Sequence, residues 1–167
     1  PATSGQGKYK IDAGSTTTIY NGGAVASNAG YIIDGQTTDA PILGVLNGIF
    51  YNAATTLKPT FANFYKQPIT PANSEDIDAF VFDNPQQQYV VATDDAVAQS
   101  GYLETYDMNT SAGSTTTGKS SATLDIGDTS ADAASFRLLR SAEDPENDEN
   151  AAFRSVVVCI NLIELQS

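Results

Sequence analysis

The sequence contains no histidine and no tryptophan, and it has one cysteine and one methionine among 167 residues. Without histidine there is no Ser-His-Asp or Cys-His arrangement, no imidazole ligand for a metal, and no imidazole acid–base step near neutral pH. One cysteine cannot form an internal disulfide, and Cys159, mid-strand among valine and isoleucine residues, is predicted to be a buried, unreactive thiol. We therefore expect no catalytic residues, no cofactor and no metal, and a protein that is not an enzyme.

Basic residues are also scarce, since 8 Lys and Arg face 20 Asp and Glu for a net charge of -12. Phosphate affinity needs a basic surface, so this balance argues against direct binding of nucleic acid or of an anionic membrane. The longest aliphatic run, residues 156–160, is far shorter than the roughly 20 residues of a membrane-spanning helix. No signal peptide is recognised at the start, and Pro1 is interpreted as following a removed initiator methionine, which predicts synthesis in the cytoplasm.

The charge is unevenly distributed along the chain. Residues 1–72 carry four lysines and three aspartates, whereas residues 73–167 carry four basic and 17 acidic side chains. One interpretation is a solvated acidic surface that keeps the protein soluble. The other is a two-faced protein, with a near-neutral part against a partner and an acidic part, including the loop around Pro145, in solvent.

The composition favours an all-β fold, because Thr, Ser, Asn and Gly make up 56 of the 167 residues. No convincing amphipathic helix is present, and only residues 129–135 could form a helical turn. The glycines at 44 and 48 predict a bulged or sharply coiled strand, and Asp34-Gly35 is a typical hairpin dipeptide. We predict an antiparallel β-barrel or two-sheet sandwich of about ten strands, at residues 16–20, 30–33, 41–51, 60–65, 77–83, 88–93, 102–108, 122–126, 136–139 and 154–165.

The domain organisation is predicted to be simple. The first dozen residues are small and polar around Lys8-Tyr9-Lys10, which is typical of an arm that orders only against something else. We assign residues 1–15 to an extended N-terminal arm and residues 16–167 to a single β domain.

Residues 113–120 read GSTTTGKS, which matches the phosphate-loop pattern G-x4-G-K-[ST]. In a nucleotide site Lys119 would contact the β- and γ-phosphate oxygens and Ser120 would bind Mg²⁺. Such a loop follows a buried strand and opens a helix, whereas residues 105–109 are mostly polar and residues 121–127 have strand composition. We attribute the match to the Thr-, Ser- and Gly-rich composition.

The acidic residues form four groups, at positions 75–78, 94–95, 125–128 and 143–149. None has the D-x-D-x-D-G loop with a glutamate at its twelfth position that binds calcium in EF-hands. A glycosidase carboxylate pair is not supported either, because there is no tryptophan for a sugar platform and the eight tyrosines are scattered. We expect surface charge, with a weak calcium site as the open alternative.

Longer strings in succession are more informative than these short motifs. They are residues 40–51 (APILGVLNGIFY), 58–65 (KPTFANFY), 79–85 (AFVFDNP), 89–94 (YVVATD), 136–140 (FRLLR) and 156–161 (VVVCIN). In order and spacing they resemble the head decoration, or structural cement, proteins of tailed double-stranded DNA bacteriophages, over roughly residues 20–165.

The resemblance implies a structural protein on the outer capsid surface of the virion, made in the host cytoplasm. Its implied partners are the major capsid protein and copies of itself, as a trimer or, in second place, a dimer. A DNA-filled shell is under outward pressure, and apolar burial with strand addition from an arm can hold its subunits together without chemistry.

We expect the less acidic N-terminal half to pack on capsid subunits and on sister copies. The candidate contact residues are Lys8, Tyr9, Lys10, Ile11, Tyr20, Phe61, Phe64 and Tyr65. Two other functions stay open. One is a virion-borne or extracellular, calcium-dependent carbohydrate-binding module that uses the acidic loops, and the other is a nucleotide-dependent enzyme that uses Lys119.

Overall fold

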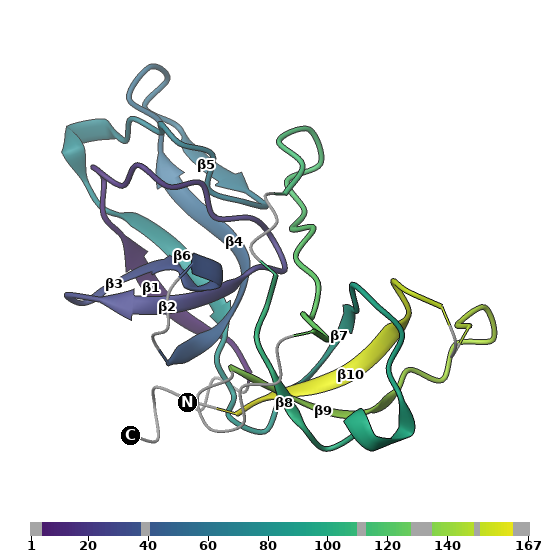
Figure 1. Ribbon diagram of the computed structural model, residues 1–167. Coiled ribbons are helices and arrows are strands. Elements are labelled where there is room, and N and C mark those ends of the chain that lie inside the picture. Colours follow the sequence, from purple (N-terminus) through teal and green to yellow (C-terminus); the bar gives the residue numbers. More distant parts are fainter. Residues whose placement is uncertain (1–4, 38–40, 110–112, 128–134, 149–150, 162–167) are drawn as a thin grey trace.

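The computed structural model describes residues 5–37, 41–109, 113–127, 135–148 and 151–161 (Figure 1). Within these ranges the chain forms ten strands and three short 3-10 helices, and no α-helix. The strands are β1 (Gly7–Ile11), β2 (Ala24–Asn28), β3 (Tyr31–Asp34), β4 (Ile42–Asn52), β5 (Pro59–Ala62), β6 (Ile77–Phe82), β7 (Gln88–Ala92), β8 (Thr105–Tyr106), β9 (Phe136–Ser141) and β10 (Ser155–Ile160). The 3-10 helices are η1 (Gly35–Thr37), η2 (Ala72–Ser74) and η3 (Gln99–Gly101).

The strands form two antiparallel sheets, so the all-β prediction is confirmed. The large sheet has the order β1-β6-β4-β2-β3, with β5 paired to the second half of β4, and the small sheet has the order β7-β10-β9-β8. The two sheets lie side by side and splay apart, the large one at the upper left of Figure 1 and the small one at the lower right. The assignment of residues 16–167 to a single β domain stays a prediction.

The large sheet is strongly coiled around its long central strand, β4. The register between β4 and β6 shifts between Leu46 and Gly48, and the register between β2 and β4 shifts next to Val25. Such bulges increase the local twist of a sheet. The sheet therefore curls until β3 contacts β1, as the glycines of β4 led us to expect.

The inner face of this curled sheet holds the first hydrophobic core. Strand residues alternate between the two faces of a sheet, and every second residue of β6 is fully buried. The buried cluster consists of Ile11, Ile19, Val25, Ile32, Leu43, Leu46, Ile49, Tyr65, Ile77, Ala79 and Val81. At about 1.5–3 kcal/mol for each large apolar side chain, this burial is the main force that holds the sheet together.

The small sheet has a second core of its own, which also joins it to the large sheet. Tyr106, Leu124, Phe136, Leu138, Val156, Val158 and Ile160 pack together there, and Ala24 of β2 and Ile42 of β4 belong to the same cluster. The small sheet therefore packs against the large sheet at β2 and β4.

The expected N-terminal arm is wrong over residues 7–11. Gly7–Ile11 forms β1, an edge strand whose whole length pairs with β6 from Gly7↔Val81 to Ile11↔Ile77. Ile11 is fully buried. The segment is therefore ordered by its own chain, through ladder hydrogen bonds and the burial of Ile11, and not by a partner.

Other strand boundaries also differ from the prediction. Residues 24–28 form β2, which was missed, whereas residues 16–20 and 122–126 contribute only isolated bridges at Ile19 and Leu124. The hairpin turn falls at Ala29-Gly30, whose φ values of 51° and 88° fit a type I′ turn, and Asp34-Gly35 leads into η1 instead. Residues 129–134 and 162–165 lie outside the described residues.

The described residues contain no helix with the length and apolar character needed to span a bilayer.

Candidate interaction surface

The outer face of the large sheet is partly open and carries aromatic and lysine side chains. In β6, Asp78 and Phe80 alternate with the buried residues of the core and therefore point outward. The register places Lys10 opposite Asp78 and Lys8 opposite Phe80, and it places Phe50 of β4 between Asp78 and Phe61 of β5. We call the surface formed by Lys8, Lys10, Phe50, Phe61, Asp78 and Phe80 the aromatic–lysine face.

Phe61 is the most exposed member of this face, with 64% of its surface accessible. Its ring lies across Gly48 of β4 and reaches Phe80, at a centroid distance of 6.2 Å. A Cβ atom at position 48 would come within 2.8 Å of the Phe61 ring, so glycine lets the ring lie over β4 in this position. The result is an aromatic stripe that crosses β5, β4 and β6.

The two lysines of β1 share one carboxylate. Lys8 Nζ and Lys10 Nζ each lie 2.6 Å from an oxygen of Asp78, whose side chain is only 14% exposed. Burial alone would raise the pKa of Asp78, but the hydrogen bonds and charges of Lys10 and Lys8 outweigh it and hold the pKa below its usual value. The hydrogen bond to Asp78 in turn raises the pKa of Lys10. The three charges sum to one positive charge, but Glu75 and Asp76 line the same hollow as Lys10, Phe50 and Asp78, so the surface here is not positive overall.

A groove of about 570 Å³ lies where the two sheets splay apart. The large sheet contributes Ala24, Val45 and Phe82 to its lining, and the small sheet contributes β7 and Val158. Residues 119–123 also line the groove, and Lys119 is the one charged residue of the lining. Phe82 follows Phe80 on the outward side of β6, so the aromatic–lysine face runs into the groove.

Three of the predicted contact residues belong to the interior instead. Ile11 and Tyr65 are fully buried in the first core. Tyr9 packs against the same core, and its hydroxyl donates to Asp83 at 2.7 Å. Because alternate residues of a strand face opposite sides, Tyr9 and Ile11 cannot share a surface with Lys8 and Lys10.

Tyr20 and Phe64 are also engaged within the chain. Their rings stack in parallel, with centroids 5.8 Å apart. The 113–119 segment packs against both rings, because Gly113 touches Tyr20 and Gly118 touches Phe64. This segment is the one that matches the phosphate loop, and no helix follows it within residues 120–127. Its glycines permit close packing against aromatic rings.

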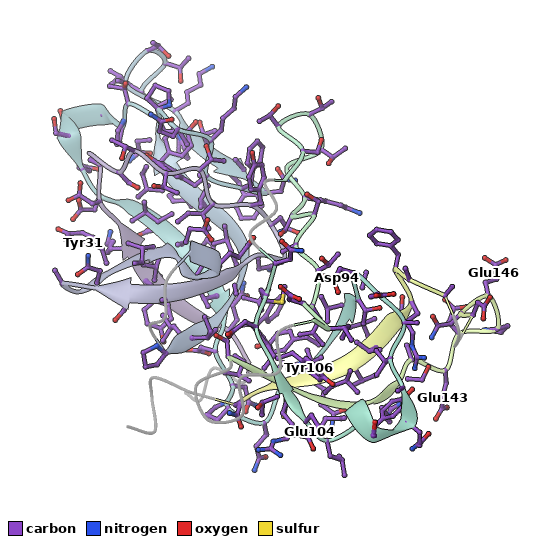
Figure 2. All side chains as sticks on the ribbon, viewed as in Figure 1. Tyr31, Asp94, Glu104, Tyr106, Glu143 and Glu146 are labelled. Atoms are coloured by element: carbon purple, nitrogen blue, oxygen red, sulfur yellow. The ribbon has the colours of Figure 1, made fainter. Side chains whose placement is uncertain are left out.

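Acidic side chains gather at the far end of the small sheet. Glu143 and Glu146 lie in the 143–148 loop, on the opposite side of the molecule from Tyr31 (Figure 2). The Asn147 side chain fixes this loop by donating to Ser141, Ala142 and Ser155. Within the described ranges, no three Asp, Glu or Cys side chains lie close enough together to hold a metal ion. Cys159 is a free thiol and is partly exposed rather than buried.

The sequence analysis found three members of the aromatic–lysine face, Lys8, Lys10 and Phe61, and missed Phe50, Asp78 and Phe80. The outward position of Asp78 and Phe80 could have been predicted from the alternation in β6, because they alternate with the apolar residues Ile77, Ala79 and Val81. The signal for Phe50 was weaker, because the bulge in β4 changes which residues face outward.

No protein-family model, no curated protein sequence and no solved structure matches this chain. Its function therefore has to be inferred from these surfaces.

Proposed function

We propose that this protein is a capsid decoration protein, which binds the outside of the major-capsid shell of a tailed double-stranded DNA bacteriophage and stabilises the shell. It acts by binding and not by catalysis. The resemblance of its strings to the decoration proteins suggested this role, and the observation that carries it is the aromatic–lysine face.

The aromatic–lysine face has the composition of a protein-binding surface. Aromatic residues are enriched at the centres of protein interfaces, where they fill pockets on the partner. Phe61 is 64% exposed, and Phe50 and Phe80 are partly exposed beside it. Covering such a ring adds about 1.5–3 kcal/mol when its burial is complete.

The distribution of charge supports an oriented attachment. The aromatic–lysine face, with Glu75 and Asp76 beside it, is close to neutral, whereas the 143–148 loop on the small sheet carries exposed Glu143, Asp144, Glu146 and Asp148. A shell-bound copy would turn the acidic loop to solvent, where like charges keep particles apart. Many copies on one lattice let modest contacts act together through effective concentration.

Self-association belongs to the same proposal. We favour a trimer at a local threefold position of the shell, with a dimer as the second choice. In either case the aromatic–lysine face meets the capsid protein.

The test begins with virus particles from the source that encodes this chain. Cryo-microscopy should show it on the outside of the shell, and shells stripped of it should rebind the purified protein. Phe61→Ala should weaken rebinding by roughly 10- to 100-fold, as expected for loss of a central aromatic anchor.

Phe153→Ala is the matched control. Phe153 is exposed to 70% but follows the acidic loop, at the far end of the small sheet, so its replacement should leave rebinding unchanged. Absence of the protein from the exterior of intact virions, or equal rebinding by both variants, would overturn the proposal for this face.

A further inference from the structure

β7 presents a free backbone edge to the groove between the sheets. Residue 92 pairs with Ser155 of β10, so Thr93 lies opposite Arg154, and the Thr93 N–H donates to the Arg154 carbonyl at 2.9 Å. Hydrogen-bonded and non-hydrogen-bonded pairs alternate along an antiparallel ladder. The backbone N–H and C=O groups of Tyr89 and Val91 therefore form hydrogen bonds with β10, whereas those of Val90 point away from β10.

The outward side of β7 is occupied at both ends, since the Gln88 carbonyl accepts from the Gln87 side chain at 3.0 Å. Leu124 donates its N–H to the Ala92 carbonyl at 2.9 Å, which covers the strand there. The N–H and C=O of Val90 have no partner among the residues that the structure describes. The Val90 side chain is 68% exposed. An edge of this kind is a template for one more strand.

The groove beside this edge has the chemistry of a strand-binding site. Its apolar lining, which includes Ala24, Val45 and Val158, could receive alternate side chains of an extended segment. Lys119 has no ion-pair partner in the described part of the chain and is the one charge of the lining. An incoming segment with a carboxylate at the matching position would pair with it.

We propose that the groove takes up an extended segment of the capsid subunit, which adds to the small sheet as a strand beside β7. The segment carries small aliphatic side chains at alternate positions and an acidic residue opposite Lys119. This inference rests on the proposed function. It states which element of the capsid subunit binds where the aromatic–lysine face runs into the groove. From the sequence we expected an arm of this protein to add as a strand to its partner. In the present proposal the partner supplies the added strand, and this protein supplies the sheet edge that accepts it.

The central test compares Val90→Pro with Val90→Thr in rebinding to stripped shells. Proline removes the outward N–H of residue 90 without removing a hydrogen bond to β10, and edge strands tolerate proline in that orientation. Threonine keeps the N–H and the β-branched shape. Val90→Pro should weaken rebinding by about tenfold or more, as expected when an acceptor on the partner strand is left unpaired, and Val90→Thr should bind like the wild type.

Thermal melting shows whether the Val90→Pro variant is folded. A second pair of variants tests the groove through side-chain charge, without a change to the backbone. Lys119→Glu should weaken rebinding by roughly threefold or more. Arg140→Glu, which changes the net charge equally but lies in β9 beside Glu143, should not. In the wild type, the Val90 amide should exchange with deuterium quickly when free and slowly on the shell.

The outcomes separate this inference from the proposed function. If the wild type binds shells but Val90→Pro binds equally well, or the Val90 amide stays unprotected, strand addition is wrong and the aromatic–lysine face remains. If Val90→Pro and Val90→Thr lose rebinding affinity equally, the side chain and not the backbone edge is recognised. That result would also overturn the proposed strand addition. If the wild type does not bind shells, both proposals fail.

Discussion

Replacing Tyr65 by alanine should lower the free energy of unfolding far more than the same change at Phe61, four residues earlier. Tyr65 is fully buried in the first core. Its hydroxyl donates to the Ser15 carbonyl at 2.8 Å, and its backbone exchanges two hydrogen bonds with Ile19. Phe61 is 64% exposed, and its ring contacts that of Phe80 at a centroid distance of 6.2 Å.

The expected magnitudes follow from this geometry. Truncating a fully buried aromatic side chain costs about 3–5 kcal/mol, through lost transfer free energy and the cavity left behind. Phe61→Ala should cost less than about 1 kcal/mol, since it removes one ring contact on the surface. Tyr65→Phe keeps the packing but leaves the Ser15 carbonyl without its donor, which costs about 1 kcal/mol.

Urea unfolding followed by far-UV circular dichroism measures these differences, and thermal melting gives a second reading. At roughly 2–4 °C per kcal/mol for a protein of this size, Tyr65→Ala should lower Tm by roughly 6–20 °C. Similar small losses for Tyr65→Ala and Phe61→Ala would refute the placement of Tyr65 in the core, and would return it to the set of surface contacts.

Two titrating groups predict opposite pH effects. Burial raises the pKa of Tyr89 to about 12, above the unfolded value of about 10, so stability should fall as pH rises from about 10 through 12. Tyr89→Phe should flatten that decline in urea titrations, and an unchanged slope would contradict the burial. The pKa of Asp78 is lowered by its lysines against the effect of burial, so its contribution is present above about pH 4 and lost as pH falls further. Asp78→Asn should therefore be less stable than wild type at pH 7, with a difference that shrinks below pH 4, and a constant difference would count against the ion pairs.

Strands with clear apolar alternation could be predicted from the sequence. In β6 the buried residues recur at every second position, and this strand was found with nearly correct limits. The start of β10 was also found to within one residue, although the predicted strand extends beyond Ile160. The bulge near Gly48 was also anticipated, because a glycine inside a long strand pattern often marks one. These features depend on neighbours in the sequence, which is why local patterns were sufficient.

The strands that were missed depend on distant partners. β1 has only one fully buried residue, Ile11, so its sequence does not show the apolar alternation of a strand. It forms a strand because β6 pairs with it along its whole length. β2 is built from small residues, and three of them, Ala24, Val25 and Ala26, are buried because the large sheet is covered there on both faces. Neither circumstance is visible in a window of ten residues.

The candidate contact residues were chosen by type and region, and three of the eight, Tyr9, Ile11 and Tyr65, lie in or against the first core. Lys8-Tyr9-Lys10-Ile11 reads as one patch in an arm, but in a strand it divides between two faces. The lysines stay outside and the apolar residues enter the core. Deleting residues 1–12 would therefore remove an edge strand from the large sheet together with Lys8 and Lys10, so a loss of capsid binding after that deletion would not separate a lost contact from a damaged sheet.

The same division determines which force would hold this protein to a shell under the proposed function. Asp78 neutralises one of the two lysines within the molecule, and Glu75 and Asp76 lie beside Lys10, so the aromatic–lysine face offers a partner little net charge. Exposed charges are screened within about 8 Å at physiological salt. Affinity at this face must then come mainly from the aromatic stripe, and the role of the lysines is to keep an otherwise acidic protein from being repelled there. The near-neutral N-terminal half of the sequence matters because it permits apolar contact, and not because it attracts.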